Sequence, residues 1–160
     1  MTTTDSSATS SDSIYERAGG LDGLRRVVDL FYASIFQDPL LRPVFAHPVA
    51  HHVEHLTAFL AEVFGGPERY TKELGGFPTI ISVHRARHIT PEQRQRFVDL
   101  FMAAVDQTGL GTDTQLRKAI GSCIEFGSHI AMVNSNAATD ADLHPQREMP
   151  RWHWQPTSSR

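Results

Sequence analysis

Apolar residues recur at helical spacing in four long stretches of the chain. The first stretch follows Gly19-Gly20 and ends at Asp38-Pro39, and the second begins near Pro48 and ends at Gly65-Gly66-Pro67. Residues three or four positions apart share one face of a helix, so each stretch predicts an amphipathic helix. The predicted stripes contain Leu21, Leu24, Val28, Phe31, Tyr32 and Ile35 in the first and His52, Leu56, Phe59, Leu60 and Val63 in the second.

The second half of the chain predicts two more long helices. Thr90 can cap a helix whose first residue is Pro91, and Gln93 stands three residues after the cap. Either Asp113 or Thr112 can cap the next helix. The predicted buried faces contain Phe97, Leu100, Phe101, Ala104 and Val105 in one helix and Leu116, Ile120, Cys123, Ile124, Gly127, Ile130 and Ala131 in the other.

The connection between these halves is expected to be mostly irregular. Residues 68–79 include a Gly-Gly pair and a proline and predict a loop. A short apolar run over residues 80–83 then leads into His84, so at most one short helix is expected there. Because none of the segments alternates with the period of a strand, the predicted fold class is all-α.

The composition divides the chain into three parts. Residues 1–12 are mostly Ser, Thr, Asp and Ala and predict a disordered leader, because they cannot bury enough apolar surface to offset chain entropy. The domain is expected to span residues 13–135. Residues 136–160 form an extension that contains Trp152 and Trp154, and these aromatic side chains predict that it packs back on the domain.

The charge and the cysteine content exclude several classes of protein. Fifteen basic residues stand against 18 acidic ones, a net charge of -3, so no broad positive field favours nucleic acid or an anionic membrane. Cys123 is the one cysteine, which excludes an intramolecular disulfide and fits a reducing compartment. Neither a signal peptide nor an apolar stretch of about 18 residues is present. The protein is expected to be cytoplasmic.

Nine histidines provide the main chemical signal. Two pairs, His51 with His55 and His84 with His88, have the four-residue spacing that lets two imidazoles reach one metal ion. One interpretation is therefore a metal-binding helical-bundle enzyme that uses the two H-x-x-x-H pairs. The chain has no H-E-x-x-H or C-x-x-C motif, so a zinc enzyme would lack its usual ligands and general base.

Two polar side chains fall on otherwise apolar helix faces. His52 shares a stripe with Leu56 and Phe59, and Tyr32 lies in line with Val28. A polar group on such a face either bonds within the core or lines a pocket. The residues alone leave both interpretations open.

An ordered series of motifs resembles the truncated haemoglobins over residues 14–133. The motifs are Tyr15-Glu16-Arg17-Ala18-Gly19-Gly20, Val28-Asp29-Leu30-Phe31-Tyr32, Phe45, Phe64-Gly65-Gly66-Pro67-Glu68-Arg69-Tyr70, Val83-His84 and Ile89-Thr90. The resemblance implies a 2-on-2 helical sandwich that binds haem b. Phe97 stands where one subgroup has tryptophan, whereas Val83 and Ile89-Thr90 look like group I. The chain therefore resembles no single subgroup throughout.

The resemblance also assigns roles to individual residues. It implies that His84 is the proximal ligand of the iron and that Tyr32 donates a hydrogen bond to the bound gas. The other residues expected at the haem are Phe45, His52, Leu56, Tyr70 and Phe97. His88 is the competing ligand, but the spacing from His84 to Ile89-Thr90 matches the family without a gap. Arg85, Arg87 or Lys72 could pair with the haem propionates.

The function implied is reversible binding of oxygen or another diatomic gas, such as nitric oxide or carbon monoxide. Oxidation of nitric oxide, with an unidentified electron donor, is a further activity of relatives. The alternatives are a non-haem metal enzyme built on the H-x-x-x-H pairs and a globin-like sensor or partner-binding domain. The oligomeric state is left as monomer or homodimer.

Overall fold

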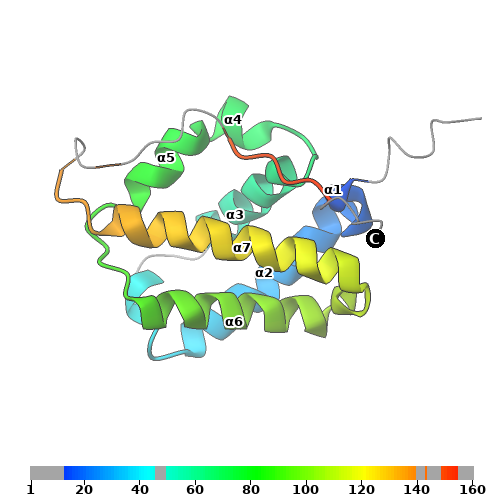
Figure 1. The fold of residues 1–160 in the computed structure, drawn as a ribbon, viewed down its shortest axis with the longest axis horizontal. Coiled ribbons are helices and arrows are strands. Elements are labelled where there is room, and N and C mark those ends of the chain that lie inside the picture. Colours follow the sequence, from blue (N-terminus) through cyan, green and yellow to red (C-terminus); the bar gives the residue numbers. More distant parts are fainter. Residues whose placement is uncertain (1–12, 46–49, 140–142, 144–148, 155–160) are drawn as a thin grey trace, which may run out of the picture.

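The computed structural model describes residues 13–45, 50–139, 143 and 149–154. These residues form helices, turns and loops with no strand among them, which confirms the predicted all-α class (Figure 1). The predicted leader, the start of the second long helix at Pro48 and much of the C-terminal extension lie outside the described residues. Within the described part, no helix combines the length and the apolar character needed to cross a membrane.

The four predicted long helices are present. They are α2 (Gly20–Gln37), α3 (Ala50–Val63), α6 (Pro91–Gln107) and α7 (Thr114–Ser135). Helix α2 packs against α3 and α6, and α6 also packs against α7, so that the α2–α3 pair and the α6–α7 pair form a two-layered sandwich (Figure 1). Short helices complete the described chain: α1 (Ile14–Arg17), η2 (Arg42–Phe45), α4 (Arg69–Glu73), α5 (Gly76–Val83) and η3 (Leu110–Thr112).

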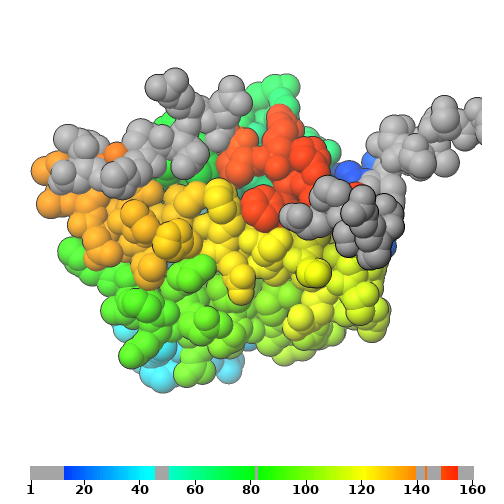
Figure 2. Space-filling view, in the orientation of Figure 1, coloured from blue at the N-terminus to red at the C-terminus, as the bar shows by residue number. Residues whose placement is uncertain are grey.

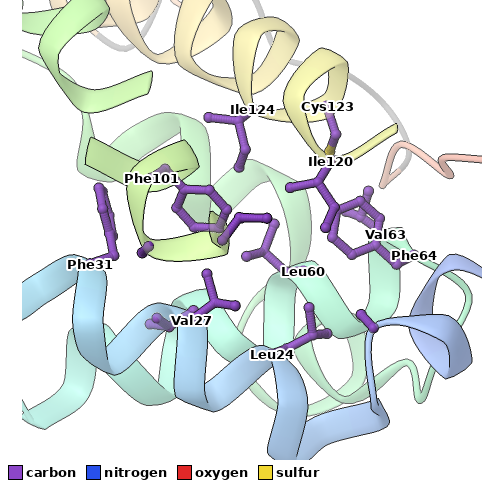
Figure 3. Packing of buried hydrophobic residues seen from close by; sticks show 14 of the residues in the cluster. Leu24, Val27, Phe31, Leu60, Val63, Phe64, Phe101, Ile120, Cys123 and Ile124 are labelled. Atoms are coloured by element: carbon purple, nitrogen blue, oxygen red, sulfur yellow. The ribbon is translucent and has the colours of Figure 1, made fainter. Parts of the chain in front are cut away.

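The apolar stripes of the four long helices meet in one core. The side chains drawn in Figure 3 come from both helix pairs and are buried. A fully buried side chain of this size contributes roughly 1.5–3 kcal/mol through removal from water. The labelled core residues are Leu24, Val27, Phe31, Leu60, Val63, Phe64, Phe101, Ile120, Cys123 and Ile124.

The prediction of a loop over residues 68–79 is wrong in part, because α4 and half of α5 lie there. Gly75 and Gly76 have φ values of +98° and +69°, so the glycine pair forms a tight break between two helices. Helix α4 is held by the buried Glu62 carboxylate, which accepts the Thr71 backbone N–H at 2.9 Å and also the Thr71 hydroxyl. Tyr70 on α4 and Phe77 on α5 are also buried, so both helices are anchored although they are too short to show a clear apolar period.

Both predicted helix starts in the second half have side-chain caps. The Thr90 hydroxyl accepts the Gln93 N–H at 3.1 Å, and the Gln93 side chain accepts the Thr90 N–H at 2.9 Å. Of the two candidates for the next cap, Asp113 takes the position and accepts the Leu116 N–H at 3.1 Å.

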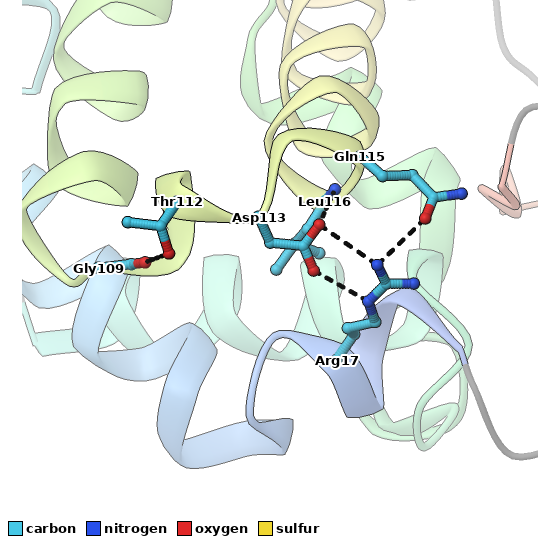
Figure 4. A network of polar contacts seen from close by, with 6 residues as sticks. All are labelled: Arg17, Gly109, Thr112, Asp113, Gln115 and Leu116. Atoms are coloured by element: carbon cyan, nitrogen blue, oxygen red, sulfur yellow. Dashed lines mark hydrogen bonds and ion pairs between the residues drawn. The ribbon is translucent and has the colours of Figure 1, made fainter.

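The Asp113 carboxylate also joins α7 to the start of the chain (Figure 4). Arg17 Nε donates to Asp113 Oδ2 at 2.9 Å, and Arg17 Nη2 donates to Gln115 Oε1 at 3.1 Å. The backbone N–H of Leu116 and then the Arg17 guanidinium hold the pKa of Asp113 below its usual value. This contact fixes the α1 end of the sandwich against α7.

Candidate functional site

A mostly apolar cavity of about 550 Å³ lies inside the sandwich. Its wall is built from α2, η2, α3, α4, α5, α6 and α7, together with Pro150 and Trp152 near the C-terminus. Its volume falls within the range of roughly 300–1,000 Å³ that is typical of cofactor sites. The site residues expected from the sequence all line this cavity: Tyr32, Phe45, His52, Leu56, Tyr70, His84 and Phe97.

His84 has the chemistry of a metal ligand. It follows the last residue of α5, and its Nδ1 donates a hydrogen bond to the Ile80 carbonyl oxygen at 2.7 Å. Burial has the largest effect on the pKa of His84 and lowers it. The hydrogen bond to Ile80 raises this pKa in part, and the positive charge of Arg87 lowers it further. The imidazole is therefore neutral near pH 7, with its proton on Nδ1. This tautomer leaves the Nε2 lone pair available to bind a metal.

His88 has a different setting. Its side chain is exposed, and its backbone adopts a φ of +51° while its N–H donates to the Ser135 carbonyl oxygen at 3.0 Å. Within the described wall of the cavity, His84 is present and His88 is not. The geometry therefore favours His84 over His88 as the ligand.

Tyr32 and His52 lie together on another part of the wall. Their rings are stacked with centroids 5.9 Å apart, and the Phe45 ring meets Tyr32 edge-on at 5.8 Å. Burial raises the pKa of Tyr32, so its hydroxyl stays protonated and can donate a hydrogen bond. The two polar side chains on apolar helix faces thus share one pocket.

Aromatic rings form much of the remaining surface. Phe45 and Phe97 are nearly parallel, with an interplanar angle of 10° and centroids 6.4 Å apart. Phe97 also packs edge-on against the buried Phe31 at 4.8 Å. Tyr70 is buried beside Phe59, with ring centroids 5.8 Å apart. Flat rings and aliphatic side chains suit a flat, apolar ligand.

The other histidine pair has less support as a metal site. His51 and His55 are exposed at the cavity, with ring centroids 6.1 Å apart. In the part of the chain that the structure describes, no three His, Cys, Asp or Glu residues form a group that could hold a metal ion. Among the described residues, a non-haem metal enzyme would therefore have at most the two imidazoles of His51 and His55 as ligands at this site.

Of the three cations considered for the propionates, Arg87 lies at the cavity. Its Nε and Nη1 donate to the carbonyl oxygens of Val83 and Val44 at 3.3 and 3.4 Å. Lys72 instead forms an exposed ion pair with Glu68 at 3.8 Å, and neither it nor Arg85 belongs to the described wall.

Several wall residues were missed from the sequence. Phe77 falls in the segment that the sequence predicts as a loop, and it is buried. Trp152 was expected to pack on the domain but not to reach the site. Cys123 was assigned to the core alone; it lies at the wall, and burial raises the pKa of its thiol to about 12.

The residues present fit the haem that the resemblance implies. The cavity offers the neutral imidazole of His84 with a fixed tautomer, the hydroxyl of Tyr32, flat aromatic surfaces and the guanidinium of Arg87. A haem site uses groups of these four kinds: an imidazole for the iron, a hydrogen-bond donor, flat apolar surfaces for the porphyrin and a cation for its carboxylates.

Comparison with known proteins agrees with this fit. The chain matches the bacterial-like globin family over residues 13–132. It is 30% identical over 121 residues to the group 2 truncated haemoglobin YjbI of Bacillus subtilis, with coverage of 76% of this chain and 89% of that protein. It is 40% identical over 67 residues to the group 1 truncated haemoglobin GlbN of Nostoc commune, with coverage of 41% and 53%.

Solved structures show the same fold. The haemoglobin of Chloroflexus aurantiacus has a TM-score of 0.68 at 31% identity, covering 75% of this chain and 97% of its own. The group II truncated haemoglobin of Bacillus anthracis has a TM-score of 0.69 at 26% identity, with coverage of 81% and 96%. The expected resemblance and the 2-on-2 architecture are thereby confirmed, and the chain belongs to the bacterial-like globin family as a truncated haemoglobin.

Proposed function

We propose that this globin holds haem b in the central cavity, with His84 as the axial ligand of the iron, and that it binds oxygen or another diatomic gas reversibly. The observation that carries the proposal is the His84 imidazole, which lines the cavity and is held as the Nδ1–H tautomer by Ile80. When bound, the haem would supply an iron that can take a small gas as a ligand.

The other residues have separate tasks in this proposal. The Ile80 carbonyl orients the His84 ring and increases the basicity of Nε2. The Tyr32 hydroxyl, protonated at all physiological pH values, donates a hydrogen bond to a polar gas ligand, and the His52 ring stacks beside it on the wall. Phe45 and Phe97 exclude water from the cavity, which strengthens that hydrogen bond.

Arg87 supports the orientation of the cofactor. A guanidinium matches the geometry of a carboxylate and stays charged at every relevant pH. The hydrogen bonds from Arg87 to Val44 and Val83 hold its side chain between η2 and the end of α5. We infer that it pairs with a propionate at the edge of the cavity.

Titration of the full chain with haemin tests the proposal. The expected result is uptake of one haemin per chain, with a Soret band that shifts when the protein is reduced and exposed to carbon monoxide. After reduction, oxygenation should be reversed by a stream of argon. Stoichiometric zinc or non-haem iron in protein that takes up no haemin would instead favour the metal-enzyme alternative.

A further inference from the structure

Residues 149–154, which we call the C-terminal strap, reach the cavity from outside the globin core. The strap runs between α4 and α7 in Figure 1, and Figure 2 shows its atoms covering the surface beside α7. Pro150 and Trp152 line the central cavity. The match to the bacterial-like globin family ends at residue 132, so this part of the wall comes from a segment beyond the matched domain.

Two hydrogen bonds hold Trp152 in place. Its backbone N–H donates to the Val63 carbonyl oxygen at 2.8 Å, at the last residue of α3. Its indole Nε1–H donates to the Ser122 hydroxyl on α7 at 3.2 Å. The indole also packs against Phe126 of α7, with ring centroids 5.4 Å apart. The side chain thus bridges the end of α3 and the middle of α7.

The neighbouring tryptophan has a different position. The Arg17 guanidinium lies 4.6 Å from the Trp154 ring centroid, over its face. Trp154 is absent from the described wall of the central cavity. Three residues before Trp154, Arg151 forms an ion pair with Glu68. Trp154 and Arg151 therefore contact the domain outside the described wall of the cavity, whereas Trp152 contributes to the wall and has its own hydrogen bonds to α3 and α7.

We propose that Trp152 is an additional wall residue of the cofactor cavity, which retains the cofactor by closing the space between α3 and α7. The inference rests on the proposed function, since it takes haem as the occupant. An indole at this place excludes water from the cavity and adds apolar contact to whatever occupies it. Without the indole, water reaches the interior and the occupant loses that contact.

Haem retention by the full-length protein tests this role. Wild type and the variants Trp152→Ala and Trp154→Ala are loaded with haemin, and the transfer of haemin to excess apomyoglobin is followed by absorbance. We expect Trp152→Ala to lose haemin about ten-fold faster, or more, the equivalent of one aromatic contact. Trp154→Ala, which removes the same side chain from the same strap, should stay within about two-fold of wild type. Equal rates for the two variants would overturn the proposal.

Two further measurements keep the test decisive. If circular dichroism shows that Trp152→Ala is unfolded, Ser122→Ala replaces it and should speed haemin loss about three-fold, as expected for one neutral hydrogen bond; an unchanged rate contradicts the proposal. If wild type takes up no haemin, the proposed function fails, and the apoprotein is titrated with 1-anilinonaphthalene-8-sulfonate. Weaker dye binding in Trp152→Ala than in Trp154→Ala would then support a wall role, and equal binding would refute it.

Discussion

At the scale of single residues, Tyr32 and His52 are polar side chains on apolar helix faces, and both line the cavity. Tyr32 is 6% exposed, and its ring stacks with that of His52. Neither residue alone distinguishes a core position from a pocket, because a buried hydroxyl or imidazole is tolerated wherever it finds a partner. Their shared place on the wall makes the pocket interpretation the better one.

Replacement of Tyr32 by phenylalanine removes the proposed donor and leaves the ring. A hydrogen bond to a charged partner contributes about 1.5–3 kcal/mol, so we expect oxygen dissociation about ten-fold to a hundred-fold faster in Tyr32→Phe. Stopped-flow mixing with carbon monoxide measures this rate. Tyr70→Phe is the matched control, since Tyr70 also lines the cavity, and it should behave like wild type. A Tyr32→Phe rate equal to wild type would remove this role.

His84 predicts a pH dependence of stability in the haem-free protein. Burial lowers the pKa of His84 below its usual value of about 6.5, so the unfolded chain binds this proton more readily than the folded one. The stability that neutral His84 gives the folded protein is fully present above about pH 6.5 and is lost as the pH falls through the lowered pKa. Urea unfolding at pH 7.5 and at pH 5.5 gives the free energy of unfolding at each pH. Between these two pH values it should fall further in wild type than in His84→Gln. Equal losses would contradict the assigned pKa shift.

The sequence predicted which residues lie at the cavity where those residues belong to a regular helix or to a motif of several adjacent residues. His84, Tyr32 and Phe97 were assigned from such positions, and all three line the cavity. Phe77 and Trp152 were not assigned, because their role depends on how short or distant segments fold back on the core. That contact depends on tertiary packing, which local spacing does not encode.

At the scale of elements, the loop after α5 determines where His84 lies. Ala86 and His88 are non-glycine residues with φ values of +63° and +51°, a conformation that costs on the order of 1–3 kcal/mol for each residue. The fully buried Ser135 at the end of α7 holds this loop. Its carbonyl oxygen accepts the His88 N–H at 3.0 Å, and its hydroxyl accepts the Ile89 N–H at 2.9 Å.

Substitution of Ser135 by alanine leaves the Ile89 N–H without its acceptor. The cost of an unsatisfied donor predicts a fall of about 1–3 kcal/mol in the free energy of unfolding, measured by urea denaturation. Asn136→Ala is the control, because Asn136 is exposed and bonds to the same Met132 carbonyl oxygen; it should change stability by less than about 0.5 kcal/mol. Similar effects for the two variants would show that Ser135 does not hold the loop.

Element boundaries followed the sequence where capping chemistry was explicit. Thr90 and Asp113 both begin helices, as their side-chain hydrogen bonds require. Helices α4 and α5 were not predicted in full, because five and eight residues are too few to show a clear apolar period. Their stability comes from the buried Tyr70 and Phe77 and from the Glu62 carboxylate.

At the scale of the whole molecule, Arg17 connects three distant parts of the chain. It bonds to Asp113 and Gln115 at the start of α7 (Figure 4) and lies over the Trp154 ring of the strap. The strap and the first helix are therefore coupled through one guanidinium. The sequence predicts that an aromatic tail packs on the domain, but it does not identify Arg17 as the cation that lies over Trp154.

Arg17→Ala should destabilise the protein more than Arg117→Ala. Arg117 bonds to Asp106 across the turn between α6 and α7, whereas Arg17 holds the strap as well, and an exposed cation–π contact alone contributes about 0.5–1 kcal/mol. Thermal unfolding followed by circular dichroism measures the difference. Equal midpoints for the two variants would show that the contacts of Arg17 are no more than local surface pairs.

The most direct test of the central claim is the absorbance spectrum of the haemin-loaded His84→Gly variant, with and without added imidazole, beside His88→Gly. If His84 is the axial ligand, His84→Gly loses the Soret spectrum of the wild type, imidazole restores it by filling the space left by the side chain, and His88→Gly keeps it throughout. A wild-type spectrum in His84→Gly without imidazole, or its loss in His88→Gly alone, would contradict the assignment of the ligand.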